Sequence, residues 1–256
     1  MASTFCRIIL RVDSDRMAKA KRLCAALLLA WTLAGCATSG GNPEDPLEPF
    51  NRAMFRFNDA VDGAVIKPVA KGYRSVVPGI LRTGISNFFS NLEDVWISVN
   101  DVLQGKFQRG FEDFTRVLFN STFGIAGVFD FASDLGLQKH NEDFGQTLGW
   151  WGVGSGAYLV LPILGPSTVR DGFGLVLDTQ ADLVFQIDGV PVHNSLYATR
   201  AISNRANLLD ASSVIEQAAL DKYTFVRQAW LQRRRNLVYD GDPPREREEP
   251  DDEPTK

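Results

Sequence analysis

The sequence predicts an all-α fold that is interrupted by one glycine-rich segment. Apolar residues recur at intervals of three and four through residues 50–118, which is the spacing of one helix face. Helical spacing returns after Asn194. Between Asn120 and Gly189, glycines and prolines are frequent and no long period survives, so short elements joined by irregular backbone are expected there.

Residues 1–35 have the features of a bacterial signal peptide. A basic stretch ending at Arg22 precedes an apolar run, residues 23–34. The run is too short to cross a bilayer, which takes ~20 apolar residues. The letters LAGC, which end at Cys36, resemble the lipobox, in which the cysteine becomes the lipid-modified first residue of the mature protein. Met17 offers an alternative start, and a short N-terminal core helix is the competing interpretation.

Processing at Cys36 would leave a chain without disulfides. Cys6 and Cys24 fall in the leader, so Cys36 alone remains and carries the covalent lipid anchor, the only attached group expected. The polar residues 36–48 fit a flexible tether. The full chain has a net charge of −4, and the leader contributes six Lys/Arg against two Asp. The mature chain is therefore more acidic, and nucleic acid is not expected as a partner.

Three helices are predicted before the glycine-rich segment. The first begins near Phe50 with an apolar face, and Pro68 is expected to end it. The second covers residues 80–103, with Gly105 just beyond it as a C-terminal stop. The third covers residues 107–118 and continues the same spacing.

Two helices are predicted after residue 209. Asp210 is expected to cap a helix through residue 219, and Asp221 another that ends near residue 238. The arginines at 233–235 lie near the C-terminus of the last helix, where cations favour the dipole. The helical domain is thus expected over residues 49–239. Residues 240–256 are charged and proline-rich, which predicts a disordered acidic tail.

The mature chain lacks the residue patterns of a metal or catalytic site. His140 and His193 are its two histidines, neither has zinc-site spacing, and no cysteine can join them, so no metal is expected. The letters GVGSGA at residues 152–157 satisfy a loose dinucleotide pattern, but no strand precedes them and prolines interrupt the helix that should follow. Ser155 lacks the flanking glycines of a nucleophile elbow.

Paired acidic residues do not change that conclusion. Glu93-Asp94 and Glu112-Asp113 are neighbours on predicted helices, where adjacent side chains point apart. We expect them to be solvated or capping groups. No catalytic residues are predicted, so the chain is not expected to be an enzyme.

Phenylalanines are abundant on the predicted helix faces. They can fill a soluble core, or some of them can face acyl chains in one membrane leaflet beside a lipid anchor. Composition does not separate these two interpretations. The phenylalanines on helical stripes are Phe50, Phe55, Phe57, Phe88, Phe89, Phe107, Phe111, Phe114, Phe119 and Phe123.

Short motifs, in order along residues 45–235, resemble those of one family. They begin with DPLEPFNR at residues 45–52, and the longest is FGQTLGWWGVGSGAYLVLPILGPSTVRDGFG at residues 144–174. Through these motifs the chain resembles the MlaA (VacJ) family of outer-membrane lipoproteins. Two departures are Pro49, where the family is expected to have glycine, and Ala157, where proline is usual.

The resemblance implies a ring-like arrangement of amphipathic helices embedded in one leaflet, around an amphipathic channel. It implies a palmitate-bearing lipid anchor, association with an outer-membrane trimeric porin, and transfer of phospholipids to the soluble periplasmic carrier of the Mla pathway. The implied function is removal of phospholipids from the outer leaflet, which maintains lipid asymmetry. Ala37 is not the aspartate that retains many lipoproteins at the inner membrane, so an anchor in the periplasmic leaflet of the outer membrane fits.

Six residues of the glycine-rich segment are candidates for the channel or for a loop beside it. The glycines would let a loop flex or approach closely, although plain turns explain them equally well. The two charged residues would line a polar passage or pair with each other. The six are Gly149, Gly152, Gly154, Gly156, Arg170 and Asp171.

Two other functions remain open from the sequence. A porin-associated scaffold lipoprotein of the envelope would use the aromatic helices as protein contacts without lipid transfer. An envelope lipid hydrolase is the third hypothesis, and it is disfavoured because no nucleophile and base can be assembled.

Overall fold

The computed structural model describes residues 45–244. The chain divides into a unit Met1–Glu48 and a unit Pro49–Lys256, and the packing described below belongs to the second unit. Cys36, the signal peptide and most of the acidic tail lie outside the described residues. Within the described range, no helix combines the length and the apolar character needed to cross a membrane.

The first predicted helix does not end at Pro68. Helix α2 (Glu48–Val61) continues through a π-helical turn, η1 (Asp62–Ile66), into α3 (Lys67–Val76). Pro68 lies in the first turn of α3, where its missing N–H is not needed and its fixed φ suits a helix start. The prediction was wrong because a proline that ends one helix can equally begin the next.

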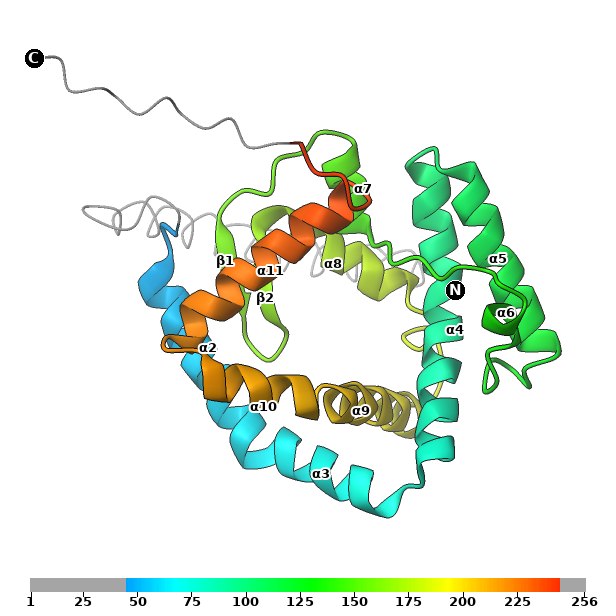
Figure 1. Ribbon diagram of the computed structural model, residues 1–256, viewed down its shortest axis with the longest axis horizontal. Coiled ribbons are helices and arrows are strands. Elements are labelled where there is room, and N and C mark those ends of the chain that lie inside the picture. Colours follow the sequence, from blue (N-terminus) through cyan, green and yellow to red (C-terminus); the bar gives the residue numbers. More distant parts are fainter. Residues whose placement is uncertain (1–44, 245–256) are drawn as a thin grey trace, which may run out of the picture. The chain divides into compact units, whose positions relative to one another are not determined.

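Helices α4 (Gly79–Leu103) and α5 (Phe107–Thr122) confirm two predicted helices, and in the structure they pack against each other as a hairpin. Gly105 joins them with φ +78°, a left-handed conformation that glycine adopts at no steric cost. A Cβ on Gly110 would lie 3.0 Å from the carbonyl oxygen of Ser98, so only glycine permits this close approach. Figure 1 shows the two helices side by side.

The glycine-rich segment contains two short helices, a hairpin and one longer helix. They are α6 (Phe131–Asp134), α7 (Phe144–Trp150), β1 (Tyr158–Leu161), β2 (Gly165–Thr168) and α8 (Val169–Ala181). The small antiparallel sheet departs from an all-α fold, and the thirteen residues of α8 exceed the short elements expected there.

An asparagine of α2 fixes the hairpin. Asn51 donates to the carbonyl oxygen of Tyr158 at 3.0 Å and accepts from the N–H of Val160 at 2.9 Å. The Asn51 side chain therefore pairs with two backbone groups of β1 for which the two-stranded sheet offers no third strand. Because that partner lies more than 100 residues away, the sequence gives no local indication of the strand.

Three helices complete the described chain: α9 (Val190–Asn207), α10 (Leu209–Ala218) and α11 (Lys222–Val238). Asp221 caps α11 as predicted, because its side chain accepts from the backbone of the first turn. Asp210 does not cap α10. It lies inside the first turn of that helix and instead accepts from Arg74 of α3 at 2.8 Å.

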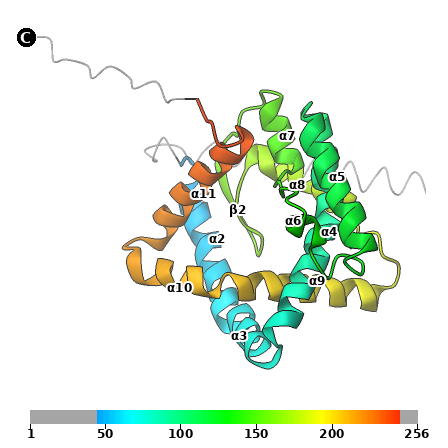
Figure 2. The same cartoon turned by 45° about the vertical axis from the view of Figure 1, so that its right-hand side comes forward.

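Two small apolar clusters hold these elements together. One joins α3 to α9 and α10 through Ala70, Ala206 and Leu209. The other joins β1 to α11 through Tyr158, Val160 and Tyr223, and Trp230 packs against it. Figure 2 shows α9 beside α3 and α4, in agreement with their contacts. Among the described residues, fewer apolar than polar side chains are buried. The buried polar residues are therefore described next.

Candidate functional site

Helix α5 places its apolar side chains outside and its polar side chains inside. Phe107 and Phe111 are 68% and 71% exposed, whereas Asp113 and Arg116 are 0% and 1% exposed. Phe114 continues the exposed face, since residues three and four apart share one side of a helix. This is the reverse of a helix packed on a water-soluble core, whose apolar stripe faces inward.

Helix α4 repeats the reversal along most of its length. Its buried polar residues include Asn91, Asp94, Asn100 and Asp101, and its exposed face includes Ile80. Monomeric soluble proteins rarely leave large contiguous apolar patches in water, so such faces indicate a membrane or protein contact. Among the phenylalanines on helical stripes, those left exposed are Phe50, Phe57, Phe107, Phe111, Phe114 and Phe123.

Two of the four acidic residues predicted to be solvated or capping groups, Asp94 and Asp113, are buried ion-pair partners instead. Asp94 pairs with Lys139, and Arg116 Nε lies 3.6 Å from Asp94 Oδ2. Burial raises the pKa of Asp94, although the charges of Lys139 and Arg116 oppose that rise. Arg116 also bonds Asp130, with Nη2 3.0 Å from Oδ1. The prediction was wrong for Asp94 and Asp113 because their partners lie on distant segments.

A second charged network joins α7, α8 and α11. Arg234 Nη2 lies 2.6 Å from Oδ1 of Asp143, the residue that caps α7, and Arg234 Nε lies 3.0 Å from Asp171 Oδ2 in α8. Arg170 Nε donates to Asp171 Oδ1 at 2.9 Å. Burial opposes ionisation of Asp143, but the hydrogen bonds and charge of Arg234 outweigh it and hold the pKa of that carboxyl below its usual value.

A polar pocket of about 380 Å³ lies beside this network. Four of the six candidate channel residues, Gly149, Gly152, Gly154 and Arg170, line it. Arg234 and Arg235 of α11 contribute to the same lining, so three arginines border one pocket. The role of these residues in a passage stays a prediction.

The remaining candidates lie elsewhere. Asp171 is engaged by Arg170 and Arg234, as described above. Gly156 has φ +68°, and a Cβ there would lie 3.0 Å from the Cβ of Val169, so a side chain would be strained by both backbone and contact. Cys36, the predicted lipidation site, lies outside the described residues and also stays a prediction.

A larger, mainly apolar pocket of about 750 Å³ was missed by the sequence analysis. It lies where α4, the segment 128–131 and α9 meet, with Leu81, Phe88 and Leu196 among its lining residues. A Cβ on Gly84 would lie 2.9 Å from Val128 Cγ1, so a glycine permits the close approach at its wall. The apolar spacing of α4 was visible in the sequence, but periodicity does not indicate that a concave surface forms.

The two histidines do not form a nucleophile–base pair within the described residues. His140 Nδ1 lies 2.8 Å from Asp113 Oδ2, and His193 packs edge-to-face against Tyr197 with ring centroids 4.8 Å apart. Ser155 lines the polar pocket, which contains neither histidine. Near His140, burial and the charges of Glu142 and Asp113 raise the pKa of Asp101 to about 8.

The described residues thus form helices with outward apolar faces, buried ion pairs and two pockets beside them. Comparison with known proteins identifies the family to which a chain with these features belongs. The family model described as "MlaA lipoprotein" matches residues 43–237. The chain belongs to the MlaA lipoprotein family. The resemblance noted from the sequence motifs is thereby confirmed.

Curated relatives agree with the MlaA assignment. A protein of Escherichia coli (strain K12) is 38% identical over 219 residues, which are 83% of this chain and 86% of the relative. One of Haemophilus influenzae is 35% identical over 232 residues, covering 87% and 92%. Both carry the name "Intermembrane phospholipid transport system lipoprotein MlaA".

A solved structure matches the fold as well. It is described as "Structural basis for maintenance of bacterial outer membrane lipid asymmetry", and it superposes with a TM-score of 0.67 at 37% identity. The match covers 76% of this chain and 98% of that chain. The helical fold predicted from the sequence is therefore the MlaA fold. The small β1–β2 hairpin is the part of it that the sequence did not predict.

The longest MlaA motif, residues 144–174, builds α7, the β1–β2 hairpin and the start of α8. It also supplies most of the polar pocket. The two departures from the motifs fit their positions. Pro49 lies in the first turn of α2, where proline is favoured, and the carbonyl oxygen of Ala157 accepts from the N–H of Val169 at 3.1 Å, which needs no particular side chain.

Proposed function

We propose that this MlaA-family chain is an outer-membrane lipoprotein that removes mislocalised phospholipids from the outer leaflet through an amphipathic channel. It passes them to a soluble periplasmic carrier and so maintains lipid asymmetry. The inverted helix α5, apolar outside and charged inside, carries this proposal. Such a helix suits a protein with hydrocarbon around it and a polar route within it.

The exposed aromatic faces support embedding in one leaflet. Phe107, Phe111 and Phe114 lie on one side of α5 and are largely exposed. Full burial of such a side chain contributes about 1.5–3 kcal/mol. A lipid anchor on Cys36 would add the second membrane signal that stable attachment requires.

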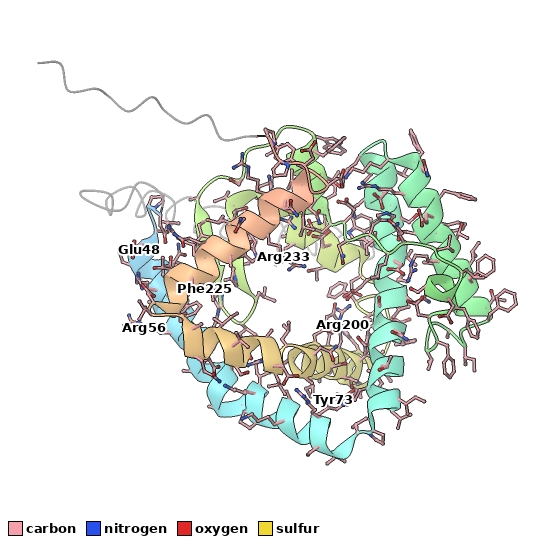
Figure 3. The ribbon with its side chains drawn as sticks, in the orientation of Figure 1. Glu48, Arg56, Tyr73, Arg200, Phe225 and Arg233 are labelled. Carbon is pink, nitrogen blue, oxygen red and sulfur yellow. The ribbon has the colours of Figure 1, made fainter. Side chains whose placement is uncertain are left out.

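The internal polar residues support a passage for headgroups. Moving a charged headgroup through hydrocarbon costs on the order of several kcal/mol, and polar walls lower that barrier. Three arginines in the lining of the polar pocket contribute positive charge that would attract a phosphate, while Arg170 and Arg234 also donate to Asp171. In Figure 3, Arg233 of α11 and Arg200 of α9 extend towards the space between these two helices.

A ring-like arrangement around such a channel is part of the proposal. It is supported by the succession of neighbours α3–α9, α9–α4, α4–α7 and α7–α11, and by the aromatic contact between Tyr223 of α11 and Phe55 of α2, the helix that continues into α3. Passage through a channel makes and breaks no covalent bond, so no catalytic group is required. A trimeric porin would hold the ring in the outer membrane, and the periplasmic carrier would receive the lipid.

One observation also favours a scaffold function without lipid transfer. The apolar face of α5 would suit a contact with a porin as well as a contact with acyl chains. Phospholipid that copurifies with the chain lacking its anchor would favour transfer. Its absence, together with retained porin binding, would favour the scaffold.

The deciding measurement is outer-leaflet phospholipid in cells that lack this chain, read with a lipid A palmitoylation reporter. We expect a rise on deletion, restoration by the wild type, and no restoration by Cys36→Ala. An unchanged level after deletion, with no paralogue covering the loss, would overturn lipid transfer.

The hydrolase hypothesis has its own test. Ser155 and His140 line different pockets, so the two side chains do not form one site. Ser155→Ala and His140→Ala should therefore leave lipid asymmetry intact at unchanged protein level. Loss of function in either variant, with lipid breakdown products disappearing, would revive an enzymatic function.

A further inference from the structure

Three potential metal ligands converge where the α4–α5 hairpin meets the segment before α7. Asp101 lies in the last turn of α4, Asp113 lies in α5, and His140 comes four residues before the helix at Phe144. One ligand atom from each lies within 4.8 Å of the other two. Both carboxylates are fully buried.

The carboxylate of Asp101 is the decisive feature. Neither of its oxygens has a hydrogen-bond partner within the described residues. A buried carboxylate without a partner is costly, and a second carboxylate beside it adds repulsion. Either a proton or a bound cation must therefore compensate this buried carboxyl group.

Among the described residues, the two basic side chains that follow Asp101 most closely in sequence do not take that role. The nearest lysine in sequence, Lys106, directs its ammonium group to Glu142 at 3.1 Å and to Asp240 at 2.7 Å. Arg109 also bonds Asp240, at 2.5 Å. The local basic groups are thus committed to other acids.

We propose that Asp101, Asp113 and His140 bind one divalent transition-metal ion of the zinc class. Two carboxylates and one imidazole are a ligand set that zinc accepts, with ligand atoms about 2.0–2.2 Å from the ion. Calcium and magnesium prefer oxygen ligands alone, so the imidazole favours zinc or a similar ion.

The existing contacts orient the imidazole for this role. His140 Nδ1 and Asp113 Oδ2 lie 2.8 Å apart, and the backbone N–H of His140 donates to Asp113 Oδ1 at 3.4 Å. Nδ1 and Oδ2 are close enough together to bind the same ion, so His140 would ligate through Nδ1 and give up its contact with Asp113 when the ion binds.

The site also has an approach from the surface. A polar pocket of about 520 Å³ is lined by His140, Glu112 and Gln138 together with the α4–α5 turn. His140 is partly exposed at this pocket, and the two carboxylates lie behind it. An ion could therefore reach the imidazole before the buried acids.

The expected consequence is structural. The ion would add to the contacts that already fasten the segment before α7 to the α4–α5 hairpin, among them the Asp94–Lys139 ion pair, the His140–Asp113 contact and the hydrogen bond from Gln104 to Glu142. The sequence predicts no metal site because the ligands are separated by 12 and 27 residues and belong to no known spacing.

The test uses the full-length chain in detergent, stripped with a chelator and titrated with Zn²⁺ against a chromophoric competitor. We expect one Zn²⁺ per chain, a higher unfolding temperature on binding, and a visible absorption band when Co²⁺ replaces Zn²⁺. Asp101→Asn and His140→Gln should each weaken binding by at least about 100-fold. His193→Gln should leave Zn²⁺ binding unchanged, because His193 packs edge-to-face against Phe185 and Tyr197, away from the cluster.

Two outcomes would overturn the proposal. One is no stoichiometric Zn²⁺ binding by the wild type. The other is a loss in His140→Gln no larger than in His193→Gln. If Asp101→Asn fails to fold, His140→Gln still decides, because His140 is partly exposed and glutamine retains a side-chain donor for Asp113.

Discussion

Arg234 of α11 forms a bidentate ion pair with Asp143, which lies 91 residues earlier in the chain. Nη2 lies 2.6 Å from Oδ1, and Nη1 bonds Oδ2. The same guanidinium reaches Asp171, with Nε 3.0 Å from Oδ2. One largely buried side chain thereby holds the start of α7 and the first turn of α8 against α11, next to the polar pocket.

Arg234→Met should destabilise the fold by about 3–5 kcal/mol, since it would leave Asp143 and Asp171 without their main cation in a mostly buried setting. Arg233→Met is the matched control. Arg233 is exposed on the same helix, so its replacement should change stability by about 0.5 kcal/mol or less. Denaturant unfolding of the full-length chain in detergent measures both, and equal losses would contradict a structural role for the network.

The same pair predicts a pH dependence. The folded pKa of Asp143 lies below its usual value because Arg234 outweighs burial. A carboxyl group with a lowered pKa stabilises the fold above the unfolded pKa, and this contribution is lost as the pH falls through the folded pKa. The stability difference between wild type and Arg234→Met should therefore be full at about pH 6 and shrink below about pH 4. Unfolding measured at both pH values checks this, and a constant difference would point to lost packing instead.

Elements with a local physical cause were predictable from the sequence. Asp221 accepts from the backbone N–H groups of Tyr223 and Thr224 at 3.0 and 3.3 Å, so the cap depends on the next three residues alone. Gly105 ends α4 for an equally local reason. Pro68 was misjudged because the sequence does not show that η1 shifts the hydrogen bonding just before it.

The candidate site was less predictable because tertiary contacts decide it. Asp94 and Asp113 are buried only because Lys139 and His140, 45 and 27 residues away, come to meet them. Helical periodicity likewise predicted the aromatic face of α5, but it did not show whether that face points to the interior or to the exterior. A face has the same spacing whether it meets a core or a membrane.

The outward position of that face gives a testable effect on membrane binding. Phe111→Glu, made in the chain that lacks its anchor (Cys36→Ala), should weaken binding to phospholipid vesicles by at least about tenfold. The change removes an exposed ring whose burial in a leaflet would contribute about 1.5–3 kcal/mol, and it places a charge at an apolar surface. Vesicle flotation with quantified bound protein provides the measurement.

Gln108→Glu is the control for charge on the same helix. Gln108 is exposed and already polar, so its replacement should change vesicle binding little. Equal weakening by both variants would indicate an electrostatic effect, and unchanged binding in Phe111→Glu would indicate that a protein partner covers this face.

The polar pocket yields the prediction that bears most directly on lipid passage. A Cβ at Gly154 meets no heavy atom within 4 Å, and Gly154 lines the 380 Å³ pocket. Gly154→Leu should therefore fold normally while its side chain occupies space that a headgroup would need. We expect outer-leaflet phospholipid to rise towards the level of cells lacking the chain, as read by lipid A palmitoylation. Gly72→Leu, at an exposed position of α3 that is equally free of contacts, should leave lipid asymmetry intact. Normal asymmetry in Gly154→Leu, at wild-type protein level, would place the passage away from this pocket and remove Gly149, Gly152, Gly154 and Arg170 as channel residues.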